Sequence, residues 1–186
     1  MISATPRTLY PQASWADTYN NQLPEVSPRE VLIEYTAHEE ARFHLGGSLV
    51  APVSDLAQAA EDAPLRPVAP AAQRVTLRVL DKATGRPVPV KLHVHGEAGE
   101  YLASTDRHRI PNAAWFEDYS VDFSHLGIHH CTYIPGETDI DLPLGRVYVE
   151  VSKGFEIAPV RRVFVVTPAT RELTVTLEKV LPWRER

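Results

Sequence analysis

The chain has 186 residues, with 24 acidic and 19 basic side chains and a formal net charge of −5. That length suits one sizeable domain, or one domain with an appendage, and a lone cysteine, Cys131, excludes a fold built on internal disulfides. The acidic balance argues against nucleic acid as the main partner, and no apolar run approaches the roughly 20 residues that cross a bilayer. Because no basic and apolar signal segment opens the sequence, we expect a cytoplasmic protein.

The first part of the chain is predicted to be irregular. Residues 1–28 contain prolines and no periodicity, which excludes long regular elements. Tyr10, Trp15 and Tyr19 are nevertheless more rings than a disordered tail tends to carry, so this arm is expected to pack on another surface. Residues 30–53 are rich in β-branched and aromatic side chains, which predicts one or two strands interrupted at Gly46 and Gly47.

A short helix and a linker are expected next. Ser54 offers an N-cap for a turn or two of helix over residues 54–62. Residues 63–73 carry regularly spaced prolines, which are typical of an extended linker. We therefore divide the chain into residues 1–72, an arm with short strands and one short helix, and residues 73–186, the main domain.

The main domain alternates apolar and polar residues with the two-residue period of half-buried strands. In residues 88–95 the pattern turns the valines and Leu92 inward, and Lys91, His93 and His95 outward. We expect this strand to form an antiparallel pair with residues 74–80, through the turn at residues 81–87. The fold class predicted is all-β, an antiparallel, immunoglobulin-like β-sandwich. Its expected strands are residues 74–80, 88–95, 139–143, 146–152, 160–166 and 171–177.

One segment, residues 104–138, interrupts this rhythm. It is far longer than the usual hairpin connection of about two to five residues, and loops of such length usually carry function or interfaces. It holds half of the eight histidines and several large rings. We interpret it as a long inserted loop that folds back on the sandwich or covers another surface.

Two motifs give the main domain a family resemblance. Asp81, Thr84, Gly85, Pro87 and Val88 form a D-x-x-T-G-x-P-V turn, and an L-P-x-G-x-x-Y strand pair starts at residue 142 and ends in G-F at residues 154–155. With them, the chain resembles the carboxypeptidase-regulatory-like, or transthyretin-like, β-sandwich. These glycines and prolines set turns and perform no chemistry, so this resemblance implies a fold alone.

A narrower resemblance covers residues 74–186. The segment WFEDYSVDFSHLGIHHCTYIPGE and the ending RELTVTLEKVLPWRER resemble the N-terminal accessory region of PHP-superfamily metallohydrolases, the polymerase and histidinol phosphatase type. In such proteins a strand ending in L-x-R-W leads into a catalytic barrel that opens with a His-x-His metal motif. The resemblance implies that the barrel would follow residue 186, so its metal ligands correspond to no residue of this chain.

His93 and His95 have the spacing of a metal pair, since residues i and i+2 share one face of a strand. No third ligand is near in sequence, and a strand surface facing solvent or a partner is the preferred interpretation. An intradiol dioxygenase would also combine a sandwich with His-x-His. Its ferric-iron tyrosines would precede the histidines after a P-G-x-Y turn, and that order is absent here.

The richest ligand cluster lies in the loop, at His125, His129, His130 and Cys131. Imidazole with thiolate suits zinc, and His125 and His129 would align on one helical turn. The preferred interpretation is instead an interface. We expect Trp115 and Phe116 to anchor the loop, and the stretch from His125 to Tyr133 to face another surface. The predicted interface residues are Trp115, Phe116, Tyr119, His129, His130 and Tyr133.

We therefore expect a non-catalytic accessory domain of a metal-dependent hydrolase, which packs on or walls a catalytic domain. The chain alone has no nucleophile paired with a base, so no catalytic residue and no cofactor are predicted. Its partner is expected to be the catalytic metallohydrolase domain or a second copy of the chain. The alternative is a self-contained module that binds a metal, zinc above all, or a small molecule through residues 104–138.

Overall fold

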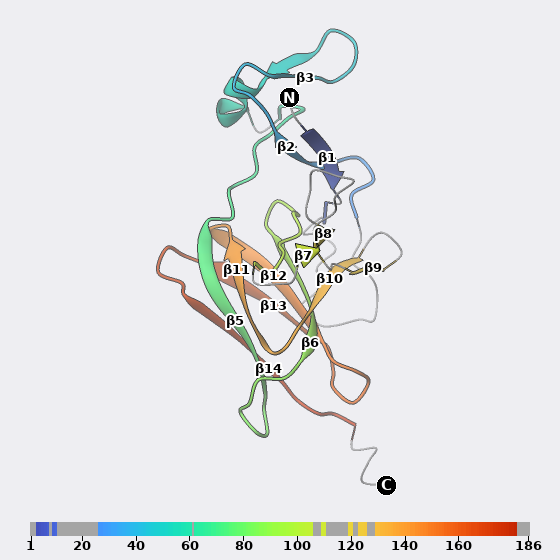
Figure 1. The fold of residues 1–186 in the computed structure, drawn as a ribbon, viewed down its shortest axis with the longest axis vertical. Coiled ribbons are helices and arrows are strands. Elements are labelled where there is room, and N and C mark those ends of the chain that lie inside the picture. The colour runs from blue at the N-terminus through green and yellow to red at the C-terminus, as the bar shows by residue number, and fades with distance from the viewer. Residues whose placement is uncertain are drawn as a thin grey trace.

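A computed structural model describes residues 3–7, 9–10, 26–60, 62–105, 109–110, 119–120, 123–125 and 129–181. In these residues the chain is built mostly from strands, as predicted (Figure 1). The strands are β1 (Ser3–Arg7), β2 (Leu32–Thr36), β3 (Arg42–His44), β4 (Val50–Pro52), β5 (Gln73–Asp81), β6 (Val90–Gly96), β7 (Arg109–Ile110), β8 (Tyr119–Ser120), β9 (Phe123–His125), β10 (His129–Ile134), β11 (Glu137–Leu142), β12 (Gly145–Ser152), β13 (Val160–Val166) and β14 (Glu172–Leu177).

Two larger sheets form the body of the protein. One has five strands in the order β13-β12-β6-β10-β9, and the other has three in the order β11-β5-β14. The pairs within them are antiparallel except β14 with β5, which run parallel. The expectation of a purely antiparallel fold is therefore wrong at this pair, because β14 reaches the open edge of β5 from the far end of the chain.

The two sheets share one hydrophobic core. Every second residue of β5, β6 and β12 is apolar and buried, with Val75, Leu92 and Val149 each at most 1 % exposed. Strands with this period present one face to a neighbouring sheet, so alternation alone places these side chains inward. The predicted burial of Val90 and Leu92 is confirmed, and Val149 and Val151 of β12 are buried with them.

The turn between β5 and β6 has a defined local chemistry. The Asp81 carboxylate accepts hydrogen bonds from the N–H and the hydroxyl of Thr84, at 2.8 and 2.9 Å, and the pKa of Asp81 is lowered mainly by this backbone bond. Gly85 follows with φ +65°, which a glycine adopts without strain. The predicted pairing of β5 with β6 is wrong. The turn carries the chain into the opposite sheet, and the pairing of its two sides is limited to the bridge between Leu80 and Pro87 and the backbone hydrogen bonds beside it.

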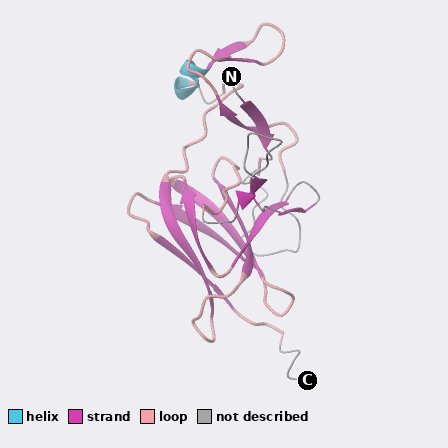
Figure 2. Cartoon of the chain, viewed as in Figure 1, coloured by secondary structure: helices cyan, strands magenta, loops and turns pink. Residues whose placement is uncertain are grey.

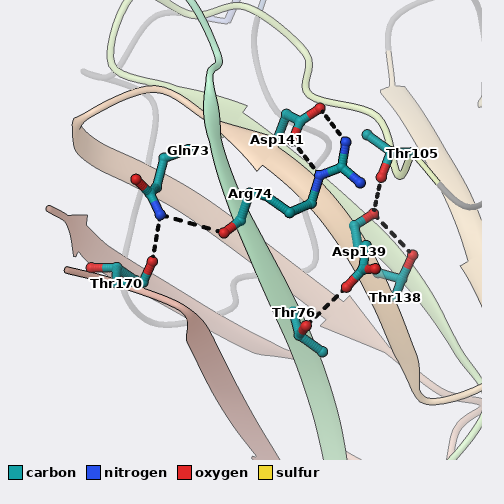
Figure 3. A network of polar contacts seen from close by, with 8 residues as sticks. All are labelled: Gln73, Arg74, Thr76, Thr105, Thr138, Asp139, Asp141 and Thr170. Carbon is teal, nitrogen blue, oxygen red and sulfur yellow. Dashed lines mark hydrogen bonds and ion pairs between the residues drawn. The ribbon is translucent and has the colours of Figure 1, made fainter. Parts of the chain in front are cut away.

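The outer face of the three-stranded sheet is polar, as Figure 3 shows. Arg74 of β5 binds Asp141 of β11 through two hydrogen bonds of 2.5 and 3.0 Å, and the Thr76 hydroxyl donates to Asp139 at 2.8 Å. Asp139 and Asp141 thus bind different side chains of β5. Exposed pairs of this kind contribute about 0 to 1 kcal/mol each, so these contacts indicate a solvent-exposed face and add little to the stability of the fold.

The N-terminal unit consists of two small sheets, β1-β2 and β3-β4, and one short helix (Figure 2). Gly46 and Gly47 form the turn between β3 and β4, which gives three strands over residues 30–53 where one or two were predicted. The helix is a 3-10 turn, η2 (Val53–Gln58), with Pro52 at its N-cap. The predicted cap at Ser54 is wrong, because Ser54 lies within the helical segment and its hydroxyl donates to the Asp55 carboxylate. In the described residues no helix has both the length and the hydropathy to span a bilayer.

Part of the predicted loop 104–138 belongs to the body. β10 lies within it and pairs with β6, placing Thr132 opposite Leu92 and Ile134 opposite Val90. Both Thr132 and Ile134 are buried. The insertion is therefore shorter than predicted, because β10 belongs to the five-stranded sheet and β11 of the other sheet begins at Glu137.

Candidate functional site

Aromatic rings gather on the outer face of the five-stranded sheet, opposite the shared core. They come from β6, β10, β12 and two connections, and contact one another at ring-centroid distances of 4.8 to 6.4 Å. We call this set the ring cluster. Its members are Tyr10, His93, His95, Tyr101, His130 and Tyr148.

The prediction that His93 and His95 face outward to solvent or a partner is wrong. The two side chains are 2 % and 1 % exposed, so β6 is buried on both faces. Two connections cover the outer face. After β6 the chain doubles back, so that Leu102 N–H donates to Val94 O at 2.9 Å, and Tyr10 of the N-terminal segment lies over both imidazoles. The two-residue period shows only which residues share a face of the strand. It gives no information on whether another segment of the chain covers that face.

The two imidazoles are bonded to each other and not arranged around a metal. His93 Nε2 lies 2.9 Å from His95 Nδ1, and His93 Nδ1 lies 2.6 Å from the carbonyl oxygen of His130. A carbonyl oxygen only accepts, so His93 Nδ1 carries a proton, and the Nε2 of the neutral ring accepts a hydrogen bond from the N–H at His95 Nδ1. Both nitrogens of His93 are thus engaged, and the remaining imidazole lone pair is on His95 Nε2.

Burial keeps His95 neutral. Its ring stacks on Tyr10 and Tyr148, at centroid distances of 5.4 and 4.8 Å with interplanar angles of 24° and 13°. Burial, and secondarily the positive charge of Arg161, lower the pKa of His95 from 6.5 to about 3. Desolvation of a buried imidazole favours its uncharged form.

A buried ion pair lies beside His93, on the adjacent strands β12 and β13 of the same sheet. Glu150 of β12 lies opposite His93 on one side and Arg161 of β13 on the other. Arg161 Nε donates to Glu150 Oε2 at 2.6 Å, and the two side chains are 3 % and 8 % exposed. Removal of Glu150 or Arg161 would leave the other charge buried away from water, so each side chain stabilises the buried position of the other.

Tyr10 closes the cluster from outside. Its hydroxyl accepts a hydrogen bond from the backbone N–H of His130 at 3.0 Å, and its own N–H donates to Gly99 O at 2.8 Å. Burial raises the pKa of Tyr10 to about 12, so the phenol is protonated at neutral pH. The side chain is 1 % exposed, and for this residue the prediction that the arm packs on another surface is confirmed.

The metal predictions in the loop are only partly addressed. His125 and His129 are cross-strand partners in the β9-β10 pair, so the predicted helical alignment of these two residues is wrong. Their side chains lie outside the described residues, while the His130 ring packs on Tyr101 at 5.4 Å. Among the described residues no three histidine, cysteine, aspartate or glutamate side chains are grouped so as to hold a metal. A zinc site that uses His125 and His129 stays a prediction.

The structure describes the side chains of only some of the predicted interface residues. Trp115 and Phe116 lie outside the described residues, and Tyr119 is described only through its backbone in β8, opposite Ile110. Tyr133 is 63 % exposed, on a strand whose neighbouring residues are buried. His130 belongs to the ring cluster and is half-buried, and its role in an interface stays a prediction.

Sequence reasoning missed Tyr101, Tyr148 and the pair Glu150–Arg161. A usable signal was present, because the outward positions of β5 are Arg and Thr, whereas those of β6 and β12 include His and Tyr. Rings at outward positions of neighbouring strands are typical of a covered face. Searches with family models, curated proteins and solved structures found nothing that matches this chain.

Proposed function

We propose that this chain is a non-catalytic accessory domain of a metal-dependent hydrolase, and that its two larger sheets form a transthyretin-like sandwich. The sandwich proposal is supported by the shared core of the two sheets and by the Asp81 turn, which has the D-x-x-T-G chemistry of the family it resembles. In the metallohydrolases of that resemblance, the catalytic barrel follows the last strand of the accessory region.

One observation supports a docking role, an apolar patch where β14 ends. Phe155, Val180 and Leu181 are 68 %, 52 % and 50 % exposed. They are held together because the N–H groups of Val180 and Leu181 both donate to the carbonyl oxygen of Glu156, at 2.9 and 3.2 Å. We call these three residues the end patch. Large apolar side chains gathered on a surface are typical of a protein interface.

The end patch also includes the segment that follows β14. A bridge between Ile157 and Lys179 fixes the segment after β14 against the β12-β13 connection, and an ion pair of 3.6 Å joins Lys179 to Glu156. The chain therefore leaves the sheet in a defined direction, beside three exposed apolar side chains. This is the arrangement expected of an accessory domain that packs on a catalytic domain.

The test is binding between the full chain and a separately produced PHP-type catalytic domain, measured by biolayer interferometry. Phe155→Asp is expected to weaken the affinity at least about tenfold, because a charge would be buried at the centre of the contact. Val165→Asp is the matched control, since Val165 is 66 % exposed at the opposite end of the same hairpin. Absence of binding by the unmodified chain, or equal loss in both variants, would refute the end patch as the docking surface.

A further inference from the structure

Tyr10 occupies a slot whose walls belong to the five-stranded sheet. His93 and His95 come from β6 and His130 from β10, and these strands pair with each other or with β12 independently of the N-terminal segment. Tyr10 meets the His93 ring edge-on at 4.9 Å and 76°, and the His95 ring stacked at 5.4 Å. The slot is thus made by one part of the fold and filled by another.

The polar end of the slot fits a phenol. The backbone N–H of His130 points to the Tyr10 hydroxyl at 3.0 Å, across 120 positions of sequence. A buried hydroxyl needs such a partner, and a buried N–H equally needs an acceptor. A phenylalanine would fill the same volume and leave this N–H unsatisfied, so the slot distinguishes tyrosine from other rings.

The backbone around Tyr10 is held as an added strand segment. Tyr10 N–H donates to Gly99 O, and Leu9 forms an antiparallel bridge with Glu100. At Gly99, with φ +86°, a Cβ atom would lie 2.4 Å from the carbonyl oxygen of Tyr10. The close approach of the two chains therefore requires glycine at this position.

We propose that this slot is a tyrosine-recognition site, which binds a tyrosyl side chain carried on an extended segment. Its occupant is the chain's own Leu9–Tyr10 segment, which anchors the N-terminal unit to the body. The recognised chemistry is a phenol between imidazoles, with its hydroxyl on a backbone N–H and its main chain against Gly99.

The experiment uses the full chain with Tyr10→Ala and p-cresol as the probe. The variant is expected to bind p-cresol and to shift the amide resonance of His130, while the unmodified chain, whose slot is filled, does not bind it. Toluene, which lacks the hydroxyl, should bind the variant about two to ten times more weakly. Tyr35→Ala is the control, because Tyr35 is a ring of the N-terminal unit that packs on Phe43 outside the slot.

A second pair of variants tests the clamp with Tyr10 still present. Gly99→Ala should displace the segment and open the slot to p-cresol. Gly85→Ala carries the same strain of a positive φ but has nothing within 4 Å of the added Cβ, so it should not open the slot. Equal p-cresol binding by Gly85→Ala and Gly99→Ala would overturn the proposal, as would binding by the unmodified chain.

A folded Tyr10→Ala variant that binds no p-cresol would also overturn the proposal. Should that variant fail to fold, Tyr10→Phe provides the measurement, since it retains the ring and removes only the acceptor. Hydrogen exchange of the His130 amide is expected to become about two to ten times faster in this variant. An unchanged rate would refute the recognition of the hydroxyl.

Discussion

Acidification should destabilise the fold through His95. The pKa of this imidazole is about 3 in the folded protein and 6.5 as the ordinary value, so in mild acid the unfolded chain binds a proton that the folded chain excludes. The stability contributed by the neutral ring is complete above pH 6.5 and is lost as pH falls from 6.5 towards 3. The ring contacts Tyr10, His93 and Tyr148, and the positive charge of Arg161 opposes its protonation.

The size of the effect follows from one protonation at 1.36 kcal/mol per pH unit. A pH of 5 lies 1.5 units below the ordinary imidazole pKa of 6.5. Protonation of His95 in the unfolded chain therefore lowers the unfolding free energy by about 2 kcal/mol relative to neutral pH. Glu100 acts in the opposite direction, because burial raises its pKa and acidification therefore favours the folded state. Comparing the chain with a His95 variant cancels the contribution of Glu100, which is common to both.

The assay is urea unfolding at pH 7.5 and pH 5 for the unmodified chain and for His95→Phe, which retains a stacking ring and removes the titrating group. The loss of unfolding free energy between the two pH values should be about 2 kcal/mol smaller in the variant. His38→Gln is the control, since the His38 side chain is 68 % exposed. An equal pH dependence in His95→Phe and the unmodified chain, or an imidazole resonance of His95 that titrates near pH 6.5, would refute the reasoning.

Two further predictions concern stability at neutral pH, measured by urea unfolding. Leu92→Ala should cost about 2 to 5 kcal/mol, because a fully buried side chain is replaced by a cavity; a cost below about 1 kcal/mol would contradict the shared core. Arg161→Met should cost about 3 to 5 kcal/mol, since it leaves the Glu150 carboxylate buried without its cation. Lys82→Met, which breaks the exposed 2.8 Å pair with Glu178, should cost less than about 1 kcal/mol, and equal costs would show that the Glu150–Arg161 site is wet.

Neither the end patch nor the ring cluster could be predicted from the local sequence pattern. Phe155 was noted only as part of a turn motif, and its exposure depends on what packs over the β12-β13 connection. Tyr148 and His95 are opposite each other across β6 and β12, a register that follows from the pairing of strands far apart in sequence. Local pattern gives no information on that register, because many pairings bury the same alternating residues.

The amino-acid sequence by itself determined β5, β6, β11, β12, β13 and β14 and the inner faces of β5, β6 and β12. Alternation placed Val75, Leu92 and Val149 in the core, since the two-residue period is a property of each strand alone. The Asp81–Gly85 turn was equally local, because the bonds from the Thr84 N–H and hydroxyl to the Asp81 carboxylate join residues three positions apart.

Only the tertiary structure decided which strands share a sheet and what covers each outer face. β5 and β6 are neighbours in sequence but lie in different sheets, and β14 joins β5 in parallel from the other end of the chain. His93 and His95 are buried because Tyr10 reaches them from the N-terminal segment. Contacts between distant segments depend on the path of the whole chain, so no pattern within β6 could have predicted them.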